Sequence, residues 1–349
     1  MAPPPELPEE VVDEILLRLP PEEPTDLLRA SLVCKRWCRL FSDPVFRRRY
    51  CRYHRTPPLL GFLHDMYEAD HCPRFVSTVA SPCSPPVLVC RSWWALDSRH
   101  GRILLHSFAP TDLLVWDPLT REQQRVPLPP YRHTFYTGAV LCAVGGCEHM
   151  DCHGGPFLVV FVGSNEDDGC IWVSVYSSET GSWGASSTIE LSLAVETLPG
   201  LLIGDALYFM IDLNRSILVY DLAGRGLSVI DVPDKKYKDI RSVVMLEGLR
   251  FVGVEDRSLY LWSRQGPGAD GTAGWEQCGI IDLATLLPLP GTSAYVAVAG
   301  FVEGTDTIFL STDVGIFTLK IKSRQVKRVG ESGQCSAIIP YTGFYLPMV

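Results

Sequence analysis

The sequence lacks the long apolar stretches that a membrane protein or a secreted protein needs. No run of 18 apolar residues occurs in its 349 residues, and the segment from Met1 to Glu6 has neither the basic nor the apolar region of a signal peptide. We therefore expect a soluble protein of the cytoplasm or the nucleus that does not bind membranes. In that compartment the 12 cysteines should be reduced thiols, many of them small buried hydrophobic residues.

The sequence also lacks the short motifs of common catalytic and nucleotide-binding sites. It contains no Gly-x-Ser-x-Gly elbow, no P-loop and no His-Glu-x-x-His pair. The run from Gly266 to Gly271 has the spacing of a dinucleotide fingerprint, but a strand pattern at Trp275 follows it where a helix is required. We interpret this run as a flexible insertion between two strands. The chain is expected to be non-catalytic, without catalytic residues or a cofactor.

Basic charge is scarce after the first 55 residues. The chain has 31 basic and 40 acidic side chains, of which residues 1–55 carry 10 and 9. The remainder is therefore acidic, which makes nucleic acid a poor partner. Hydrophobic residues form 46% of the chain and aromatic residues 10%, which is ample for a folded core. We expect a globular protein behind a disordered tail at residues 1–5.

Helical periodicity dominates the first fifty residues. Pro8 suits the first position of a helix, and the apolar residues that follow recur at i, i+3, i+4 and i+7 until Pro20 ends the helix. A second helix is expected from Leu27, after a cap at Thr25 or Asp26, and a third across residues 33–41. The sequence thus predicts a three-helix module at residues 6–50, closed by a short segment near Phe46, and a linker at residues 51–57.

The ordered apolar pattern of this module resembles an F-box. The residues that carry the resemblance are Leu7-Pro8, Ile15-Leu16, Leu19-Pro20, Asp26-Leu27-Leu28, Val33-Cys34-Lys35-Arg36-Trp37 and Asp43-Pro44-Val45-Phe46. The resemblance implies a Skp-type adaptor as partner, and through it the cullin scaffold of a ubiquitin ligase. It also implies an adaptor-binding face formed by Leu7, Pro8, Ile15, Leu16, Leu28, Val33 and Trp37. The alternative is a helical cap whose apolar residues all face the following domain.

Short strand patterns replace the helical pattern from about residue 58 to the end at 349. Nine segments rich in β-branched and aromatic residues alternate with Gly, Pro, Asp, Asn and Ser, and no helical run interrupts them. The predicted strands cover residues 103–108, 113–116, 157–162, 171–176, 206–211, 217–220, 258–262, 307–310 and 316–321. This pattern predicts an all-β domain.

A weak internal repeat selects among the all-β architectures. A strand, a polar turn and a second strand recur around positions 116, 176, 220, 262 and 320, and the two longest intervals contain insertions at 145–155 and 266–274. A period of roughly 40–50 residues is typical of a four-stranded propeller blade. We predict a β-propeller of six blades, with five or seven as neighbouring possibilities, in which the segment 337–346 pairs with 59–62 to close the ring. An F-box before such repeats also resembles plant F-box proteins with kelch-like or F-box-associated propellers. The alternative is a large β-sandwich.

One cluster of cysteine and histidine residues supplies candidate metal ligands. It comprises Cys142, Cys147, His149, Cys152 and His153. Thiolates and imidazoles at short spacing are typical zinc ligands, but the spacing differs from known zinc fingers and Cys142 lies in an apolar strand pattern. The sequence therefore favours a loop with incidental Cys and His residues and no metal, with zinc as the alternative.

These patterns together predict the substrate-recognition subunit of a Skp/cullin/F-box ubiquitin ligase. The F-box would hold the adaptor, and the propeller would present a target protein that the sequence does not identify. Catalysis would then rest on proximity. The alternatives are a propeller enzyme or small-molecule sensor that uses its central pocket, and a scaffold that binds the adaptor without promoting degradation.

Overall fold

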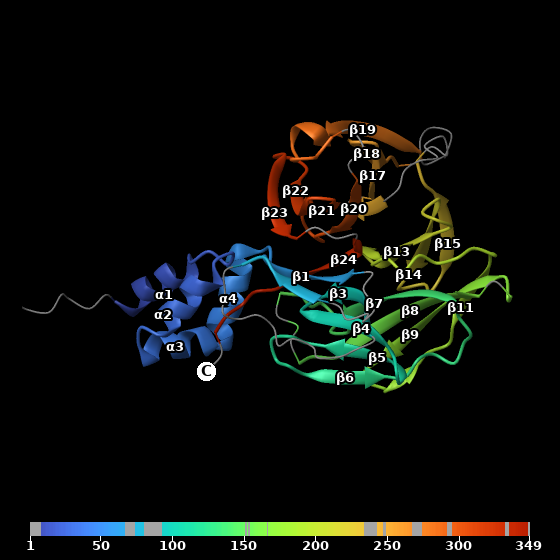
Figure 1. Cartoon of the computed structure of the whole chain (residues 1–349). Helices are drawn as coiled ribbons and strands as arrows, with labels where there is room; N and C mark the ends of the chain where they lie inside the picture. Colours follow the sequence, from blue (N-terminus) through green and yellow to red (C-terminus); the bar gives the residue numbers. More distant parts are fainter. Residues whose placement is uncertain are drawn as a thin grey trace, which may run out of the picture.

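The structure, a computed structural model, joins a helical module to a ring of β-sheets (Figure 1). It describes residues 8–66, 74–79, 93–150, 152, 154–165, 167–233, 243–246, 249–266, 274–291, 295–331 and 335–347. Within these ranges, no helix has both the length and the apolar character that crossing a bilayer requires.

Four short helices form the helical module. They are α1 (Glu9–Leu17), α2 (Pro24–Ser31), α3 (Lys35–Ser42) and α4 (Pro44–His54). Prolines stand at the start of three of these helices, where a missing N–H costs no hydrogen bond. Asp43 caps α4, because its side chain accepts a hydrogen bond from the Val45 N–H at 3.0 Å. Helix α2 begins at Pro24, slightly before the predicted cap.

The last helix of the module is longer than the short closing segment that the sequence predicts. It runs 11 residues to His54 and so occupies part of the expected linker. Tyr50 and Cys51 explain the extension, since both are buried in the core of the module. The Tyr50 hydroxyl also donates a hydrogen bond to the Leu19 carbonyl at 2.7 Å, which ties α4 to the end of α1.

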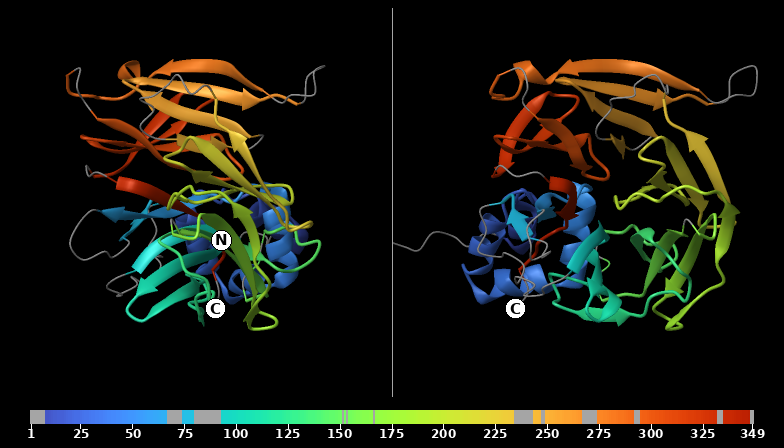
Figure 2. Two further views of the ribbon diagram at one scale, coloured as in Figure 1. Left: turned by 90° about the vertical axis from the view of Figure 1, so that its right-hand side faces the viewer. Right: turned by 45° about the vertical axis from the view of Figure 1, so that its right-hand side comes forward.

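Six antiparallel sheets make up the rest of the described chain, in agreement with the predicted number of blades. Figure 2 shows them arranged as a ring around a central axis. The alternative of a β-sandwich is therefore excluded. The nine predicted strands all fall on observed strands, and residues 206–211 match their strand at both ends.

The first three sheets contain the closing blade and its two successors. Their strands are β24 (Cys335–Thr342), β1 (Leu59–Met66) and β2 (Arg74–Ser77); β3 (Trp93–Arg99), β4 (Arg102–Phe108), β5 (Thr111–Trp116) and β6 (Gln123–Val126); and β7 (Phe135–Cys142), β8 (Phe157–Asn165), β9 (Cys170–Ser177), β10 (Ser182–Trp183) and β11 (Ser187–Glu190). In the third sheet both β10 and β11 pair with β9.

The other three sheets each have four strands in chain order. They are β12 (Leu201–Ile203), β13 (Ala206–Ile211), β14 (Ser216–Asp221) and β15 (Leu227–Asp231); β16 (Val243–Leu246), β17 (Arg250–Glu255), β18 (Ser258–Arg264) and β19 (Trp275–Asp282); and β20 (Val296–Phe301), β21 (Thr307–Thr312), β22 (Gly315–Lys320) and β23 (Gln325–Gly330). A 3₁₀ turn, Leu283–Thr285, follows β19. Strands β18 and β19 pair across the predicted insertion, whose residues 267–273 lie outside the described chain.

The predicted repeat corresponds to the third strand of five of the six blades; the closing blade has no copy. Positions 116, 176, 220, 262 and 320 lie in β5, β9, β14, β18 and β22. The four aromatic residues among them are at most 4% exposed, whereas Lys320 is exposed. The same position in the blade therefore buries a large aromatic ring four times, which accounts for the repeat in the sequence.

The two ends of the domain close the ring through the part of the predicted segment that lies in β24, whereas Phe344 and Leu346 beyond it pack in the core of the helical module. Strand β24 pairs with β1 in antiparallel register, with Leu63 opposite Ile339 and Phe62 opposite Pro340. Phe62 in turn packs on Phe309 of the preceding blade, with ring centroids 5.1 Å apart. Closure removes the open sheet edges that would otherwise template aggregation.

Candidate functional site

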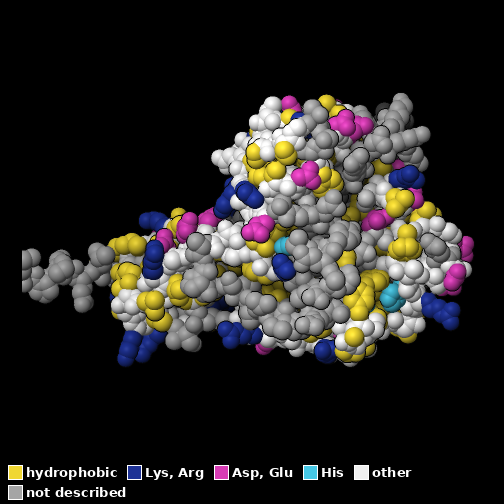
Figure 3. All heavy atoms as spheres, viewed as in Figure 1, with side chains coloured by type: hydrophobic (Ala, Val, Ile, Leu, Met, Phe, Trp, Pro, Cys, Tyr) yellow, Lys and Arg dark blue, Asp and Glu magenta, His cyan; other side chains and the backbone are white. Residues whose placement is uncertain are grey.

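The helical module exposes a set of large apolar side chains beside its own closed core. These residues are Val11 (42% exposed), Ile15 (46%), Leu32 (76%), Val33 (63%) and Val45 (57%). Figure 3 shows hydrophobic side chains gathered over the helical module, at the end of the molecule away from the propeller. Single exposed apolar residues are common, but several on a module of this size indicate a contact surface.

The structure separates the seven residues of the predicted adaptor face into different environments. Pro8, Ile15 and Val33 are exposed, and Leu28 and Trp37 are half-buried. Leu7 lies outside the described residues. Leu16 is 1% exposed and packs in the module core, so its assignment to a partner surface is corrected. The α1 pattern did not distinguish the two neighbours, because Ile15 and Leu16 are both apolar and lie only 100° apart around the helix.

An ion pair brings the exposed residues of different helices to one end of the module. The Arg36 guanidinium lies 3.3 Å from the Glu9 carboxylate, which joins the start of α3 to the start of α1. Val11 and Val33 lie two and three residues from these partners along the chain. We call Val11, Ile15, Leu32 and Val33 the apolar face of the module.

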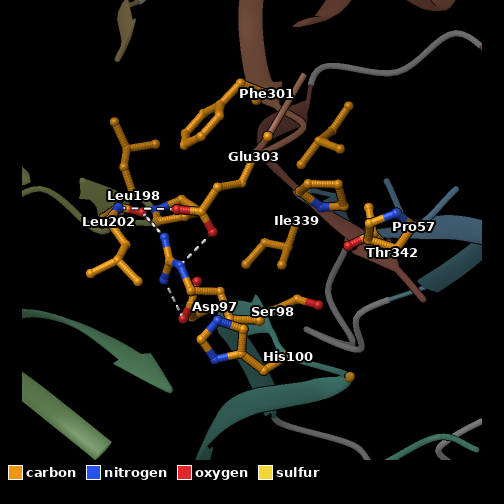
Figure 4. Close-up of a pocket in the computed structure, with 18 of the residues that line it drawn as sticks. Pro57, Asp97, Ser98, His100, Leu198, Leu202, Phe301, Glu303, Ile339 and Thr342 are labelled. Carbon is orange, nitrogen blue, oxygen red and sulfur yellow. Dashed lines mark hydrogen bonds and ion pairs between the residues drawn. The ribbon is translucent and has the colours of Figure 1, made fainter. Parts of the chain in front are cut away.

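A cavity of about 810 Å³ lies among the blades, next to the junction with the helical module. Figure 4 shows Asp97, Ser98 and His100 on one wall, Leu198 and Leu202 on a second, and Phe301 and Glu303 above them. The linker residue Pro57 and the β24 residue Thr342 complete the side toward the module. Its volume falls within the range of about 300–1,000 Å³ that is typical of small-molecule sites.

Three charged groups on the cavity wall bind one another. The Arg99 guanidinium binds the Asp97 carboxylate at 2.6 Å and the Glu303 carboxylate at 2.7 Å, and it also donates to the Gly200 carbonyl. Asp97 accepts a further bond from the Val140 N–H at 2.8 Å. These contacts connect four blades, those of β3, β7, β12 and β20, so we call Arg99, Asp97 and Glu303 the inter-blade clamp. The clamp joins blades of the ring, and its charged groups are engaged with one another.

Burial shifts the ionisation of both ends of the clamp. Desolvation raises the pKa of Asp97 to about 6, although the Arg99 guanidinium and the Val140 N–H act in the opposite direction. Desolvation acts to lower the pKa of Arg99, but the Asp97 and Glu303 carboxylates outweigh it and hold that pKa above its usual value. At neutral pH the clamp is therefore an ionised pair.

The predicted cysteine and histidine cluster is brought together at the edge of the same cavity. One donor atom each of Cys142, Cys147, His149 and Cys152 lies within 4.8 Å of all the others. His153 lies outside the described residues. Burial, together with the neighbouring Cys147 and Cys142, raises the pKa of the Cys152 thiol. A catalytic cysteine needs a lowered pKa, so the contact of Cys152 with His149 at 3.6 Å does not indicate a nucleophile.

Sequence reasoning missed the inter-blade clamp altogether. A signal was available, because Asp97 and Arg99 interrupt an apolar strand two residues apart and therefore share one face. Glu303 is more than 200 residues away in sequence, and nothing local connects it to that pair. The exposed pair Val11 and Leu32 was also missed, since both resemble ordinary core positions of a helical stripe.

Comparisons with known proteins agree with this architecture. Residues 5–53 match the family described as F-box-like, and residues 94–348 match the family described as F-box protein AT5G49610-like, beta-propeller. The Arabidopsis thaliana protein "F-box protein At5g03970" is 24% identical over 363 residues, which cover 93% of this chain and 83% of that protein.

Solved structures with some likeness include Kluyveromyces lactis Hsv2 and apo AztD from Citrobacter koseri. Hsv2 is 10% identical with a TM-score of 0.39, and the match covers 70% of this chain and 66% of Hsv2. AztD is 11% identical with a TM-score of 0.39, and the match covers 78% of this chain and 79% of AztD. Scores this low support no conclusion, and the propeller assignment rests on the six sheets and the family match. The chain belongs to the family of F-box proteins with an AT5G49610-like β-propeller.

Proposed function

We propose that this F-box protein is the substrate-recognition subunit of a Skp/cullin/F-box ubiquitin ligase. Its apolar face would bind the Skp-type adaptor, and its propeller would bind a target protein. The observation that carries the proposal is the exposure of Leu32, Val33 and Ile15 on a module whose core is already closed by other residues. Burying such side chains against a partner gains roughly 1.5–3 kcal/mol each.

The ligase itself would need no catalytic group from this chain. The adaptor and the cullin would bring a ubiquitin-charged enzyme close to a target held on the propeller. Holding two reactants in place converts a bimolecular step into an effectively unimolecular one, and this effect is worth about 7–11 kcal/mol in favourable cases. The inter-blade clamp is consistent with this division of labour, because its charged groups bind one another across blades.

The adaptor interface can be tested with one substitution and a matched control. Leu32→Asp places a charge in the centre of the apolar face, whereas Leu213→Asp changes a leucine of similar exposure, 72%, on the propeller. Both variants should fold, because neither side chain belongs to the core. We expect Leu32→Asp to weaken adaptor binding at least tenfold, about 1.4 kcal/mol, and Leu213→Asp to leave it unchanged. Wild-type affinity of the Leu32→Asp variant, measured by calorimetry with the purified adaptor, would refute the assignment.

The ligase role needs a separate experiment in cells. Proximity labelling of the full-length chain, with and without proteasome inhibition, should recover the adaptor and the cullin, together with proteins that accumulate when the proteasome is blocked. Recovery of the adaptor without the cullin would instead identify a non-degradative scaffold. The Leu32→Asp variant is the negative control, since it should lose both partners at once.

The cavity supports a second candidate, a small-molecule sensor. About 810 Å³ bordered by Leu198, Leu202 and Phe301 could hold a mostly apolar ligand of moderate size. A ligand there should raise the melting temperature of the full-length chain. Replacing Leu202 by Trp should abolish that rise without affecting adaptor binding. A ligand-induced rise that survives this substitution would place the ligand elsewhere.

A further inference from the structure

The strongest unassigned feature outside the apolar face is the loop between β7 and β8. It runs from residue 143 to 156, contains no helix or strand within its described residues, and carries three of the clustered donors on Cys147, His149 and Cys152. The fourth donor, Cys142, is the last residue of β7. Loops of this length without secondary structure are uncommon in compact domains unless they have a function of their own.

The distances within the cluster fit a tetrahedral metal site. The Sγ atoms of Cys147 and Cys152 are 3.5 Å apart, and the Cys152 Sγ lies 3.6 Å from Nδ1 of His149. A zinc ion with Zn–S bonds of about 2.3 Å and Zn–N bonds of about 2.0 Å holds its ligands at separations of about 3.8 Å between sulfurs and about 3.5 Å between sulfur and nitrogen. Closing the cluster on an ion would therefore need shifts of only a few tenths of an ångström at these two contacts.

A disulfide does not account for the same geometry. Cys142, Cys147 and Cys152 are free thiols, and 3.5 Å greatly exceeds the S–S bond length of about 2.05 Å. A disulfide would also leave one of the three sulfurs unpaired. The sequence spacing had favoured incidental residues, but a chance arrangement does not explain why a donor of all four side chains converges.

The surroundings of the cluster orient its members as metal ligands require. The backbone N–H of His149 donates to the Cys147 Sγ at 3.4 Å, a contact that stabilises a thiolate. The His149 ring stacks on His100, with ring centroids 3.9 Å apart and planes within 15°. Nδ1 of His100 accepts a hydrogen bond from the Cys142 N–H at 3.1 Å, so the same histidine supports both ends of the cluster.

From this geometry we infer that Cys142, Cys147, His149 and Cys152 bind one structural Zn²⁺ ion. Three thiolates and one imidazole form a closed tetrahedral set with no open position for a substrate. Mixed sulfur and nitrogen ligands suit zinc better than the hard cations Mg²⁺ and Ca²⁺, which take oxygen. The site is structural and does not depend on the proposed ligase function.

The loop that the ion would hold also connects the propeller to the helical module. Glu148 binds Arg52 of α4 through two contacts, at 3.1 Å and 3.3 Å. Met150 packs against the module core, which also contains Phe344 from the end of the chain. Both residues lie between zinc ligands in the sequence. Zinc would therefore fix the two loop residues that position the module against the propeller.

Metal analysis of the full-length chain tests this inference directly. The chain, purified without chelators from zinc-supplemented cells, should contain one equivalent of zinc, and Co²⁺ in its place should show the visible absorption of a tetrahedral thiolate site. The double variant Cys147→Ser, Cys152→Ser should lose the metal, and the control Cys170→Ser, Cys278→Ser should retain it. His149→Cys should keep zinc through a fourth thiolate, whereas His149→Ala should bind it more weakly.

Several results would overturn the inference. They are substoichiometric zinc in the wild-type chain, another metal in its place, full zinc in the Cys147→Ser, Cys152→Ser variant, or a Cys147–Cys152 disulfide found by mass spectrometry of the unreduced protein. The wild-type zinc content and the Co²⁺ spectrum remain decisive even if a variant fails to fold. The link to the module has its own readout, since removing zinc should increase proteolysis at residues 55–58. Unchanged cleavage there would overturn that link.

Discussion

The inter-blade clamp should be the most sensitive polar feature of the propeller. Replacing Arg99 by Met keeps much of the side-chain volume but removes the guanidinium. Asp97, only 2% exposed, and Glu303 then lose their counter-charge, and the Gly200 carbonyl loses its donor. The contacts between the β3, β12 and β20 blades weaken together, because the Arg99 side chain bonds to groups of all three blades.

The expected loss is large because the charges that remain are buried. Breaking a buried ion pair by removing one partner typically costs about 3–5 kcal/mol. For a chain of this size, each kcal/mol lowers the melting temperature by about 2 °C, so the variant should melt at least about 6 °C below the wild type. An exposed ion pair gives a control: Arg29 pairs with Asp26 on α2, and their side chains are 76% and 47% exposed. Arg29→Met should cost no more than about 1 kcal/mol.

The pH dependence separates lost charge pairing from lost packing. In the wild type, burial raises the pKa of Asp97 to about 6, above its unfolded value of about 3.9. Protonation of Asp97 in the folded protein therefore contributes its full stabilisation below pH 3.9. This contribution is lost as the pH rises to 6, and above pH 6 the stability no longer depends on Asp97 protonation. Without the guanidinium the pKa of Asp97 rises further, so in Arg99→Met this loss continues above pH 6. The stability difference between variant and wild type should therefore widen from pH 6 to pH 8, by up to about 1.4 kcal/mol per pH unit.

The assay is urea unfolding of the full-length proteins, followed by tryptophan fluorescence at several pH values. The double variant Asp97→Asn, Arg99→Met should be less destabilised at pH 8 than Arg99→Met alone, since it leaves no charge at position 97. A loss below about 1 kcal/mol for Arg99→Met, or a loss that does not change with pH, would refute the reasoning that the clamp is a buried ion pair.

Two further predictions concern a buried histidine and a tight approach of two strands. Burial lowers the pKa of His106 to about 4, with His133 adding to the effect, so the stability it contributes is present above pH 6.5 and is lost as the pH falls toward 4. Thermal unfolding should show a loss of up to about 3 kcal/mol over that window. His106→Gln should flatten this dependence, and an unchanged profile would contradict the assignment. Gly300→Ala should destabilise the ring by about 1–3 kcal/mol, because its Cβ would meet the Ile338 carbonyl oxygen of the closing strand. Gly226→Ala is the control, since no atom lies within 4 Å of its Cβ position, and equal melting temperatures for the two variants would speak against the clash.

Much of the propeller was predictable because each blade repeats the same local physics. Alternating apolar residues and turn residues mark strands, and a large aromatic ring near the end of the third strand marks the period. Glycine and proline content predicts an insertion between β18 and β19, whose residues 267–273 lie outside the described chain. The blade with the weakest local signal is the closing one, whose strands β1 and β24 come from opposite ends of the domain. Its pairing was predictable only from the requirement that the ring leave no open edge.

The helical module was predictable from the sequence, but its apolar face was not predictable residue by residue. The helical period identifies which positions are apolar, but it cannot assign neighbours such as Ile15 and Leu16 to the core or the surface without knowing where α4 packs. The core that buries Leu16 also contains Tyr50 and Phe344, whose rings contact each other. Phe344 lies more than 300 residues after Leu16 in the sequence. Contacts of that sequence separation leave no local trace.

The sequence by itself determined that the chain has a helical module of F-box type and a ring of short strands, because both depend on periodicities that are local in the chain. Tertiary structure alone decided which apolar side chains stay exposed and that Arg99 binds acids from two blades. It also decided that the donors within residues 142–152, which the sequence already grouped, meet at one point. The first two properties depend on distances between segments far apart in sequence. Such distances are set only when the blades close into a ring and the β7–β8 loop packs against α4.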